Sequence, residues 1–255
     1  LARTAERSNF KNLPRKYVKE NKMDTVGKIH SFQSLGAVDG PGLRCVVFMQ
    51  GCPLRCIYCH NPDAQSFAGG EEYTPEKMAQ KILRYKPYIK DGGVTVSGGE
   101  PLMQPDFVRE LFKILKQNNI HTALDTSGIG DLKKAKSVLE YADLVLADVK
   151  FLSDEDYTEY CKAEFSRVKD FLDLTQKMNI PLWIRQVIVP GINDSEKNIL
   201  SLKEFLKKYN NIEKTELLPF RKLCLPKYEN LGMEFKLKDT PEMSEDKIKQ
   251  LQKLL

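Results

Sequence analysis

The chain has 255 residues, of which 41% are hydrophobic and 29% charged, a balance typical of a globular protein with a full core. No apolar run approaches the ~18 residues that a membrane helix requires, so we expect no membrane partner. The net charge of +5 comes from residues 1–22, which hold seven Lys or Arg and two Asp or Glu. The rest of the chain is neutral overall, and we expect no nucleic-acid partner.

The basic segment 1–22 precedes Met23, where patterned sequence starts. It lacks a starting methionine and an apolar signal-peptide core, and we interpret it as a tag remnant or a non-native leader. An Arg-rich organelle transit segment is the alternative. Residues 23–255 contain no repeat or low-complexity linker, so they are expected to form one domain.

From residue 43 onward, short β-rich segments alternate with helical ones. We expect strands at 43–49, 93–97, 121–126, 143–150, 181–189 and 214–220, all apolar enough to be buried on both faces of a parallel sheet. We expect helices at 75–89, 104–118, 131–141, 154–178, 195–209 and 244–255. Six strand–helix alternations favour an α/β fold, either a doubly wound sheet or a complete or partial barrel.

Unusual polar groups follow the strands, at the points where the strands end. A cysteine-rich loop follows the first strand, SGGE (97–100) the second and DT (125–126) ends the third. DVK (148–150) ends the fourth strand, PGIND (190–194) follows the fifth and Arg221 follows the sixth. In both fold types the working residues lie at the C-terminal ends of parallel strands, so one mouth is expected to collect all six groups.

The cysteine loop, QGCPLRCIYCHNP (50–62), holds Cys52, Cys56 and Cys59. A disulfide framework would leave an odd thiol, and a zinc site lacks a second CxxC pair, since His60 directly adjoins Cys59. An ordinary [4Fe–4S] cluster takes four cysteines, and Cys161 and Cys224 are distant in sequence. A cluster held by three thiols remains, with one iron open to a ligand. The three isolated cysteines, including Cys45, indicate a reduced, cytoplasmic setting.

The CxxxCxxC spacing of residues 52–59, followed by SGGE, resembles the radical S-adenosylmethionine (SAM) superfamily. Within it, the chain is similar to the glycyl-radical-enzyme activases, and most of all to those of pyruvate formate-lyase. The resemblance covers residues 26–240 and rests on the segments GKIHSFQSLGAVDGPGLRCVVFMQGCPLRCIYCHNPD (27–63), LDTSG (124–128), DVK (148–150), WIRQVIVPG (183–191) and ELLPF (216–220). The cysteine-rich insertion of several other activases is absent, because no cysteine occurs between Cys59 and Cys161.

This resemblance implies a partial parallel (β/α)6 barrel of the radical SAM type and an oxidoreductase. In the family, a [4Fe–4S] cluster reductively cleaves SAM to a 5′-deoxyadenosyl radical, which abstracts hydrogen from a backbone glycine of a partner enzyme. The implied cluster ligands are Cys52, Cys56 and Cys59, and Lys150 joins them as an expected catalytic residue. The expected SAM contacts are Tyr58, Cys59, His60, Gly98, Gly99, Glu100, Asp148, Val149, Lys150, Arg185 and Arg221.

Two further sites follow from the same resemblance. Asp125, Thr126 and Asp148 correspond to a monovalent-cation site beside the SAM carboxylate, where oxygen ligands suit a hard cation. Asp39, in the DGPG segment 39–42, would hold the backbone of the incoming glycyl loop. The alternatives for these residues are a strand-end ion pair between Asp148 and Lys150, and simple turns at Asp125 and at 39–42.

The chain departs from the family pattern at Arg221, where close family members have a histidine. Arginine keeps its charge and is bulkier, so it would either stack on adenine or point away to bind substrate. The implied partners are pyruvate formate-lyase, as a glycyl radical enzyme substrate, and flavodoxin or ferredoxin as electron donor, with the chain itself a monomer. The alternatives are an activase of another glycyl radical enzyme, a peptide-modifying radical SAM enzyme, a non-catalytic iron–sulfur electron carrier and a zinc-binding interaction module.

Overall fold

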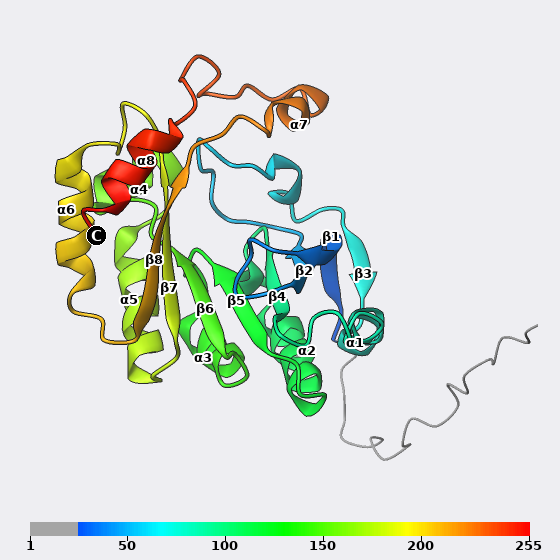
Figure 1. The fold of residues 1–255 in the computed structure, drawn as a ribbon. Helices are drawn as coiled ribbons and strands as arrows, with labels where there is room; N and C mark the ends of the chain where they lie inside the picture. Colours follow the sequence, from blue (N-terminus) through cyan, green and yellow to red (C-terminus); the bar gives the residue numbers. More distant parts are fainter. Residues whose placement is uncertain (1–24) are drawn as a thin grey trace, which may run out of the picture.

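The computed structural model describes residues 25–255, in which helices line the outside of one strongly curved sheet (Figure 1). The basic segment 1–22, interpreted above as a tag remnant or leader, lies outside the described residues. The strands are β1 (Gly27–Gly36), β2 (Arg44–Met49), β3 (Glu71–Tyr73), β4 (Gly93–Gly98), β5 (Thr122–Thr126), β6 (Leu144–Asp148), β7 (Leu182–Ile188) and β8 (Ile212–Pro219). The α-helices are α1 (Pro75–Leu83), α2 (Pro105–Gln117), α3 (Leu132–Leu139), α4 (Asp154–Cys161), α5 (Phe165–Lys177), α6 (Glu196–Leu206), α7 (Leu225–Asn230) and α8 (Glu245–Gln252). Two short 3-10 helices are η1 (Pro62–Ala64) and η2 (Pro101–Met103).

The sheet has eight strands in the order β3-β1-β2-β4-β5-β6-β7-β8. The six strands from β2 to β8 run parallel to one another, whereas β1 pairs antiparallel with both β2 and β3. Strands β3 and β8 are the two edges, so the sheet does not close. The prediction of a partial parallel barrel of six strands is therefore confirmed, with an antiparallel pair added at one edge.

Three local features differ from the expected elements. Strands β1 and β3 were not predicted, because residues 27–36 contain no continuous apolar run and β3 has only three residues. The expected helix 154–178 is two helices, since Lys162 caps α4 in the left-handed conformation with φ 57°. Helix α7 lies between the expected strand 214–220 and the expected helix 244–255, where no element was predicted, and it has a proline in its first turn.

The side chains of the parallel strands alternate between two environments. Outward-facing residues such as Val94, Val96 and Val145 are fully buried in the main core beneath the helices. Inward-facing residues near the strand ends are polar, namely Ser97, Asp125, Asp148 and Arg185. Five helices begin at a residue whose side chain accepts a hydrogen bond from the first turn: Thr74, Asp131, Ser153, Ser195 and Ser244. This framework places the polar strand ends inside the curve of the sheet.

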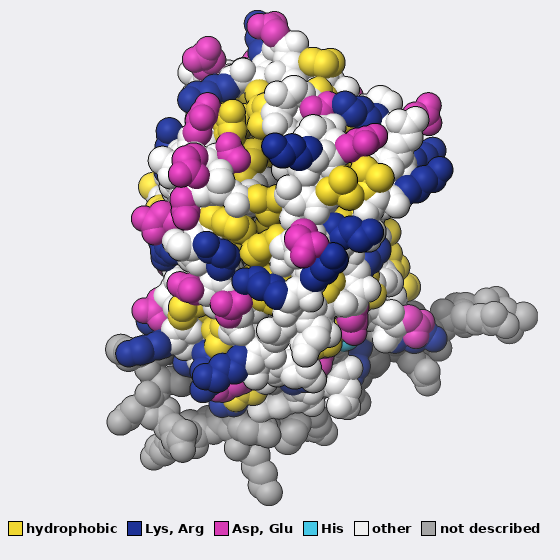
Figure 2. All heavy atoms as spheres, turned by 90° about the vertical axis from the view of Figure 1, so that its left-hand side faces the viewer, with side chains coloured by type: hydrophobic (Ala, Val, Ile, Leu, Met, Phe, Trp, Pro, Cys, Tyr) yellow, Lys and Arg dark blue, Asp and Glu magenta, His cyan; other side chains and the backbone are white. Residues whose placement is uncertain are grey.

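The face formed around α4, α6 and α8 carries basic and acidic side chains interspersed with apolar ones (Figure 2). Neither sign of charge forms a large continuous patch on this face. Among residues 25–255, no helix combines the length and the apolar character needed to cross a membrane.

Candidate active site

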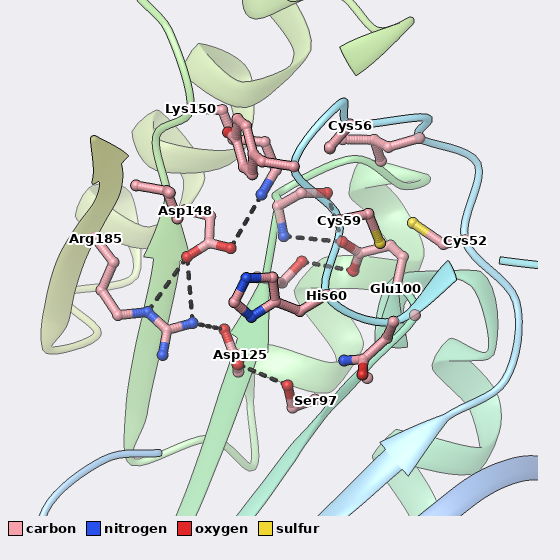
Figure 3. A pocket seen from close by; sticks show the side chains of 18 of the residues that line it. Cys52, Cys56, Cys59, His60, Ser97, Glu100, Asp125, Asp148, Lys150 and Arg185 are labelled. Atoms are coloured by element: carbon pink, nitrogen blue, oxygen red, sulfur yellow. Dashed lines mark hydrogen bonds and ion pairs between the residues drawn. The ribbon is translucent and has the colours of Figure 1, made fainter. Parts of the chain in front are cut away.

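A cavity of about 340 Å³ lies inside the curve of the sheet, at the C-terminal ends of β2 and β4–β8. Its volume is in the range of small-molecule and cofactor sites. The cysteine loop forms one wall, the strand ends of β4–β7 form the floor and the opposite wall, and Asp39 reaches it from the loop between β1 and β2. All predicted site residues except Val149 and Arg221 line this cavity (Figure 3).

Backbone hydrogen bonds on both sides hold the cysteine loop in place. The amides of Gly51 and Cys52 donate to carbonyls of the η1 segment at 2.8 and 3.1 Å. The amides of Arg55 and Ile57 donate to the last turn of α4 at 2.8 and 3.0 Å. The loop is therefore fixed against two different elements, and its three predicted ligand thiols, those of Cys52, Cys56 and Cys59, are half-buried along one wall of the cavity.

The two glycines after β4 allow that strand to approach the cysteine loop. Gly98 has φ 108°, and a Cβ on it would lie 2.3 Å from the amide nitrogen of Met49. A Cβ on Gly99 would lie 2.3 Å from the carbonyl oxygen of Gly51. Any larger residue would push the SGGE segment and the cysteine loop apart. The glycines thus set the width of the cavity at the point where the two motifs meet.

Glu100 is 1% exposed, and four hydrogen bonds converge on its carboxylate. The amides of Leu102 and Ser127 donate to it at 3.0 and 2.8 Å, and the hydroxyls of Thr126 and Ser127 donate at 2.6 and 2.5 Å. Burial raises the pKa of Glu100, while these hydrogen bonds lower it. This carboxylate ties the end of β4 to the end of β5 and forms part of the cavity wall.

Two acidic and two basic side chains form a charge network on the opposite wall (Figure 3). The Arg185 guanidinium bridges Asp125 and Asp148, with 3.2 Å between its Nη2 and Asp148 Oδ1. Lys150 Nζ lies 3.0 Å from Asp148 Oδ2, and the Ser97 hydroxyl donates to Asp125 at 2.6 Å. Although burial raises the pKa of Asp148, the charges of Lys150 and Arg185 hold it below its usual value. The network thus pairs two carboxylates with two cationic side chains, so its formal charges cancel.

Tyr58 contributes an aromatic surface to the cavity, and its hydroxyl group is unpaired. The side chain is 5% exposed, and its ring packs 6.3 Å from that of Phe151, centroid to centroid. Its buried hydroxyl finds no hydrogen-bond partner among residues 25–255. A buried donor without a partner is costly in a folded protein and marks a place where a ligand can supply one.

Comparisons with known proteins place this geometry in a family. The profile described as the Radical SAM superfamily matches residues 46–202. The chain is 46% identical to the pyruvate formate-lyase-activating enzyme of Clostridium pasteurianum, over 90% of this chain and 97% of that protein. The chain belongs to the pyruvate formate-lyase-activating enzyme family of the radical SAM superfamily.

Solved structures agree with this membership. The structure of a domain of a pyruvate-formate lyase-activating enzyme from Bacteroides vulgatus superposes with a TM-score of 0.54 at 27% identity, covering 64% of this chain and 92% of that one. A radical SAM methyltransferase from Sphaerobacter thermophilus shares the fold with a TM-score of 0.61 at 13% identity, covering 83% of this chain and 63% of that one. Membership of the superfamily implies a [4Fe–4S] cluster and SAM as cofactors.

The residues present fit both radical SAM cofactors. The three half-buried thiols of one loop suit a cluster with one open iron, and the unpaired Tyr58 hydroxyl, the glycine backbone and the charge network suit a zwitterionic ligand. Among residues 25–255, no three His, Cys, Asp or Glu side chains converge on a position for a single metal ion. A cluster spreads its ligands over several irons and so does not require that convergence.

The thiols differ in their electrostatic surroundings. Burial and the nearby Glu100 raise the pKa of Cys52 to about 12, and burial also raises the pKa of Cys59. A hydrogen bond from the Cys161 thiol lowers the pKa of Cys56 to about 7, against the effect of burial. Without a cluster, Cys52 and Cys59 are therefore protonated at neutral pH. The fold brings Cys161 close to the loop, but only as a neighbour of Cys56 outside the cavity lining.

Two expected SAM contacts lie outside the cavity. Val149 is fully buried, because side chains alternate along the chain and Asp148 already faces inward. Arg221 directs its guanidinium to the Met243 carbonyl and the Glu245 carboxylate, and its own carbonyl pairs with His60 Nε2 at 2.9 Å. Arg221, which stands where close family members have a histidine, thus links the end of β8 to α8 and to the cysteine loop.

The expected cation site contains all three of its residues, but their oxygens have partners. Asp125 and Asp148 share Arg185, and the Thr126 hydroxyl donates to Glu100. Arg185 already supplies the positive charge between the two carboxylates, and a monovalent cation stays a prediction. The inward residue Val187 was not predicted, although it stands two positions from Arg185 and so shares its face of the sheet.

Proposed function

We propose that this protein activates pyruvate formate-lyase by placing a radical on a backbone glycine of that enzyme. The single observation that carries the proposal is that the three cluster thiols, the charge network and Asp39 line the same cavity. Sequence membership in the activating-enzyme family supports the same conclusion. A cofactor site and a peptide-binding group in one cavity are what hydrogen abstraction from a protein chain requires.

In this proposal the cysteine loop holds the cluster through Cys52, Cys56 and Cys59. When bound, the cluster and SAM supply a 5′-deoxyadenosyl radical that removes a hydrogen atom from the substrate. The Tyr58 ring would form the surface that receives the adenine, and His60 would help to close that side. The backbone at Gly98 and Gly99 would leave room for the methionyl group, and the charge network around Arg185 would bind its charged ends.

The Lys150 side chain is 12% exposed, less than that of its partner Asp148. Its ammonium lies 6.0 Å from the centre of the Tyr58 ring. The charge of Asp148 keeps the pKa of Lys150 raised, although burial lowers it. We propose that this fixed ammonium orients the cofactor carboxylate. The cation at Asp125, Thr126 and Asp148 would bind only if Arg185 yields part of its contact with the two carboxylates.

The Asp39 carboxylate is proposed to accept hydrogen bonds from the backbone of the glycyl loop. Among the described residues no group donates a hydrogen bond to this carboxylate, although Asp39 is half-buried and lines the cavity. Burial and the charge of Asp125 raise its pKa, and Arg185 and Arg44 oppose that effect. A backbone N–H from an entering peptide would supply the missing partner.

The remaining parts of the proposal concern partners and setting. A flavodoxin or ferredoxin would deliver single electrons to the cluster, and the chain would act as a monomer on its larger protein substrate. The six free cysteines suit a reducing cytoplasm. The client could also be another glycyl radical enzyme or a peptide that is modified, and the experiment below separates these outcomes.

Anaerobic mixing with pyruvate formate-lyase, SAM and a one-electron reductant tests the proposal. We expect a glycyl radical doublet in the electron paramagnetic resonance spectrum and one 5′-deoxyadenosine per radical. SAM cleavage that continues without a doublet would reject pyruvate formate-lyase as the client. Reversible cluster reduction without any SAM cleavage would indicate a non-catalytic electron carrier. A Cys56→Ser variant provides the matched negative control.

A further inference from the structure

A second group of polar residues lies at the opposite end of the sheet, below the cavity. Arg44 is the first residue of β2 and is 0% exposed. Its Nε donates to the Thr95 hydroxyl at 2.8 Å, and its Nη1 donates to the carbonyls of Pro41 and Gly92 at 2.7 and 3.0 Å. Its Nη2 donates to the Val94 carbonyl at 3.0 Å and contacts His121 Nδ1 at 3.1 Å. All five guanidinium N–H groups are thereby used.

No carboxylate forms an ion pair with Arg44 within residues 25–255. Burial lowers the pKa of Arg44 to about 10, with Asp39 and Asp143 opposing that effect from a distance, so the group is charged at neutral pH. A fully buried charge with only neutral acceptors is more costly than an apolar side chain of similar size. Such a residue calls for an explanation beyond packing.

The acceptors of Arg44 show what it holds. The Pro41 carbonyl belongs to the segment Asp39-Gly40-Pro41-Gly42, and the Thr95 hydroxyl that receives Arg44 Nε donates in turn to the Asp39 carbonyl at 2.6 Å. The segment is thus bound to Arg44 at two points, once directly and once through Thr95. The other three bonds fix the guanidinium to the starts of β4 and β5, which are rigid parts of the sheet.

The shape of the segment matches this attachment. Gly40 has φ 128°, and a Cβ on it would lie 3.1 Å from Arg44 Nε. Gly42 has φ 67°, and a Cβ on it would lie 2.4 Å from the Asp91 carbonyl oxygen. Both positions require glycine, and the chain turns tightly enough to present the Asp39 side chain upward to the cavity.

We propose that Arg44 and Thr95 are positioning residues that hold the 39–42 segment so that the Asp39 carboxylate meets the backbone of the substrate peptide. This inference rests on the proposed function, because it deepens the role of Asp39. Neither residue lines the cavity, so neither touches the cofactors. Loss of either contact should loosen the segment and weaken peptide binding while leaving SAM binding intact.

The test uses Thr95→Val, which is nearly isosteric but lacks the hydroxyl, and Thr95→Ser, which keeps it. Arg44→Lys keeps the charge but cannot reach five acceptors. The substrate probe is a short peptide copied from the radical-bearing loop of pyruvate formate-lyase, with the full chain loaded anaerobically with cluster and SAM. We expect Thr95→Val and Arg44→Lys to raise the KM for the peptide about tenfold or more, and Thr95→Ser to stay near the wild type. The Kd for SAM should remain unchanged in all three.

Hydrogen exchange on the same proteins provides a readout independent of catalysis. We expect faster amide exchange at residues 37–43 in Thr95→Val and Arg44→Lys, with unchanged exchange in the cysteine loop. In combination with Asp39→Ala, either variant should add little further loss in peptide KM, because all act through one carboxylate. If Arg44→Lys does not fold, the comparison of valine with serine at position 95 carries the test.

The outcomes separate the two proposals. If the wild type forms no glycyl radical but exchange at 37–43 still depends on Thr95 and Arg44, the proposed function fails and the positioning of the segment stands. If the wild type is active, and Thr95→Val changes neither the exchange nor the peptide KM, the positioning role is overturned. Equal loss of SAM and peptide binding would also overturn it, because it would indicate a general structural role.

Discussion

The two ends of the partial barrel handle buried charge in opposite ways. At the mouth, Asp125, Asp148, Lys150 and Arg185 neutralise one another along a cavity wall. At the base, Arg44 carries its charge alone, surrounded by carbonyls, a hydroxyl and an imidazole. The charges at the mouth face a space that a ligand enters, and they can exchange partners with it. All N–H groups of the Arg44 guanidinium at the base are hydrogen-bonded, and these bonds fix the backbone around it.

The largest effect is expected when a cluster thiol is removed from the mouth. Cys52→Ser should load little iron and reduce SAM cleavage to background, since a hydroxyl is a poor iron ligand. Iron content and 5′-deoxyadenosine formation measure this. Cys45→Ser is the matched control, because the buried Cys45 thiol only donates to the Ser34 carbonyl at 3.0 Å and a serine hydroxyl can do the same. Full activity in Cys52→Ser would show that this thiol does not ligate the cluster.

Arg185→Met tests whether the charges at the mouth depend on one another. The substitution leaves Asp125 and Asp148 facing each other without their shared guanidinium, and breaking a buried charge network in this way costs about 3–5 kcal/mol of unfolding free energy. We expect this loss in urea unfolding, together with weaker SAM binding. Arg109→Met, which removes a half-exposed arginine paired with Asp106 on α2, should cost less than about 1 kcal/mol. Equal costs for the two substitutions would contradict the account of the mouth.

Much of the mouth was predictable from the sequence because strand ends in a parallel sheet share an edge. The SGGE and DVK segments followed apolar runs, so their meeting in one cavity required only the strand order. The surroundings of Val149 and Arg221 were harder to predict. Val149 faces the core rather than the cavity, and Arg221 pairs with Glu245 on a different helix. The family resemblance named both residues as SAM contacts but did not indicate what their side chains touch in this chain.

The hydrogen-bond network around Arg44, at the opposite end of the sheet from the cavity, was not predictable from strand order. Arg44 is the second residue of the apolar run 43–49, and nothing local distinguishes it from an exposed strand-end arginine. Its acceptors come from β4, from the residue before β5 and from the 39–42 segment, and they meet only in the folded sheet. Strand β1 was missed for a related reason, since its alternating pattern becomes a strand signal only when β2 and β3 pair with its two sides.

A pH titration of cluster loading should sharpen the picture of the mouth. Cys52 has a folded pKa of about 12 without a cluster, so its thiol must lose a proton when iron binds. The fraction of thiolate rises tenfold per pH unit below that value, so apparent cluster affinity should increase steadily from about pH 6.5 to 8.5. Competition with an iron chelator across this range measures it. An affinity independent of pH would mean that the thiols are already ionised before loading.

The smallest effect is expected at the surface contact between α7 and the cysteine loop. Lys227 Nζ lies 2.8 Å from Asn61 Oδ1 and 3.2 Å from Asp63 Oδ1, and the Asp63 carboxylate also contacts His30. Because this pair is partly exposed, Lys227→Ala should change the unfolding free energy by only about 0.2–1 kcal/mol. Thermal unfolding at low and high salt checks this, and the difference should shrink as salt rises. A loss as large as that of Arg185→Met would contradict the description of this contact as a partly exposed surface pair.

Mössbauer spectroscopy of the anaerobically reconstituted protein tests the central claim most directly, namely that three thiols of one loop hold a cluster with one open iron. The account predicts three similar irons and one distinct iron, with the distinct signal alone changing when SAM is added. Four equivalent irons that ignore SAM, or protein that takes up no iron, would contradict it.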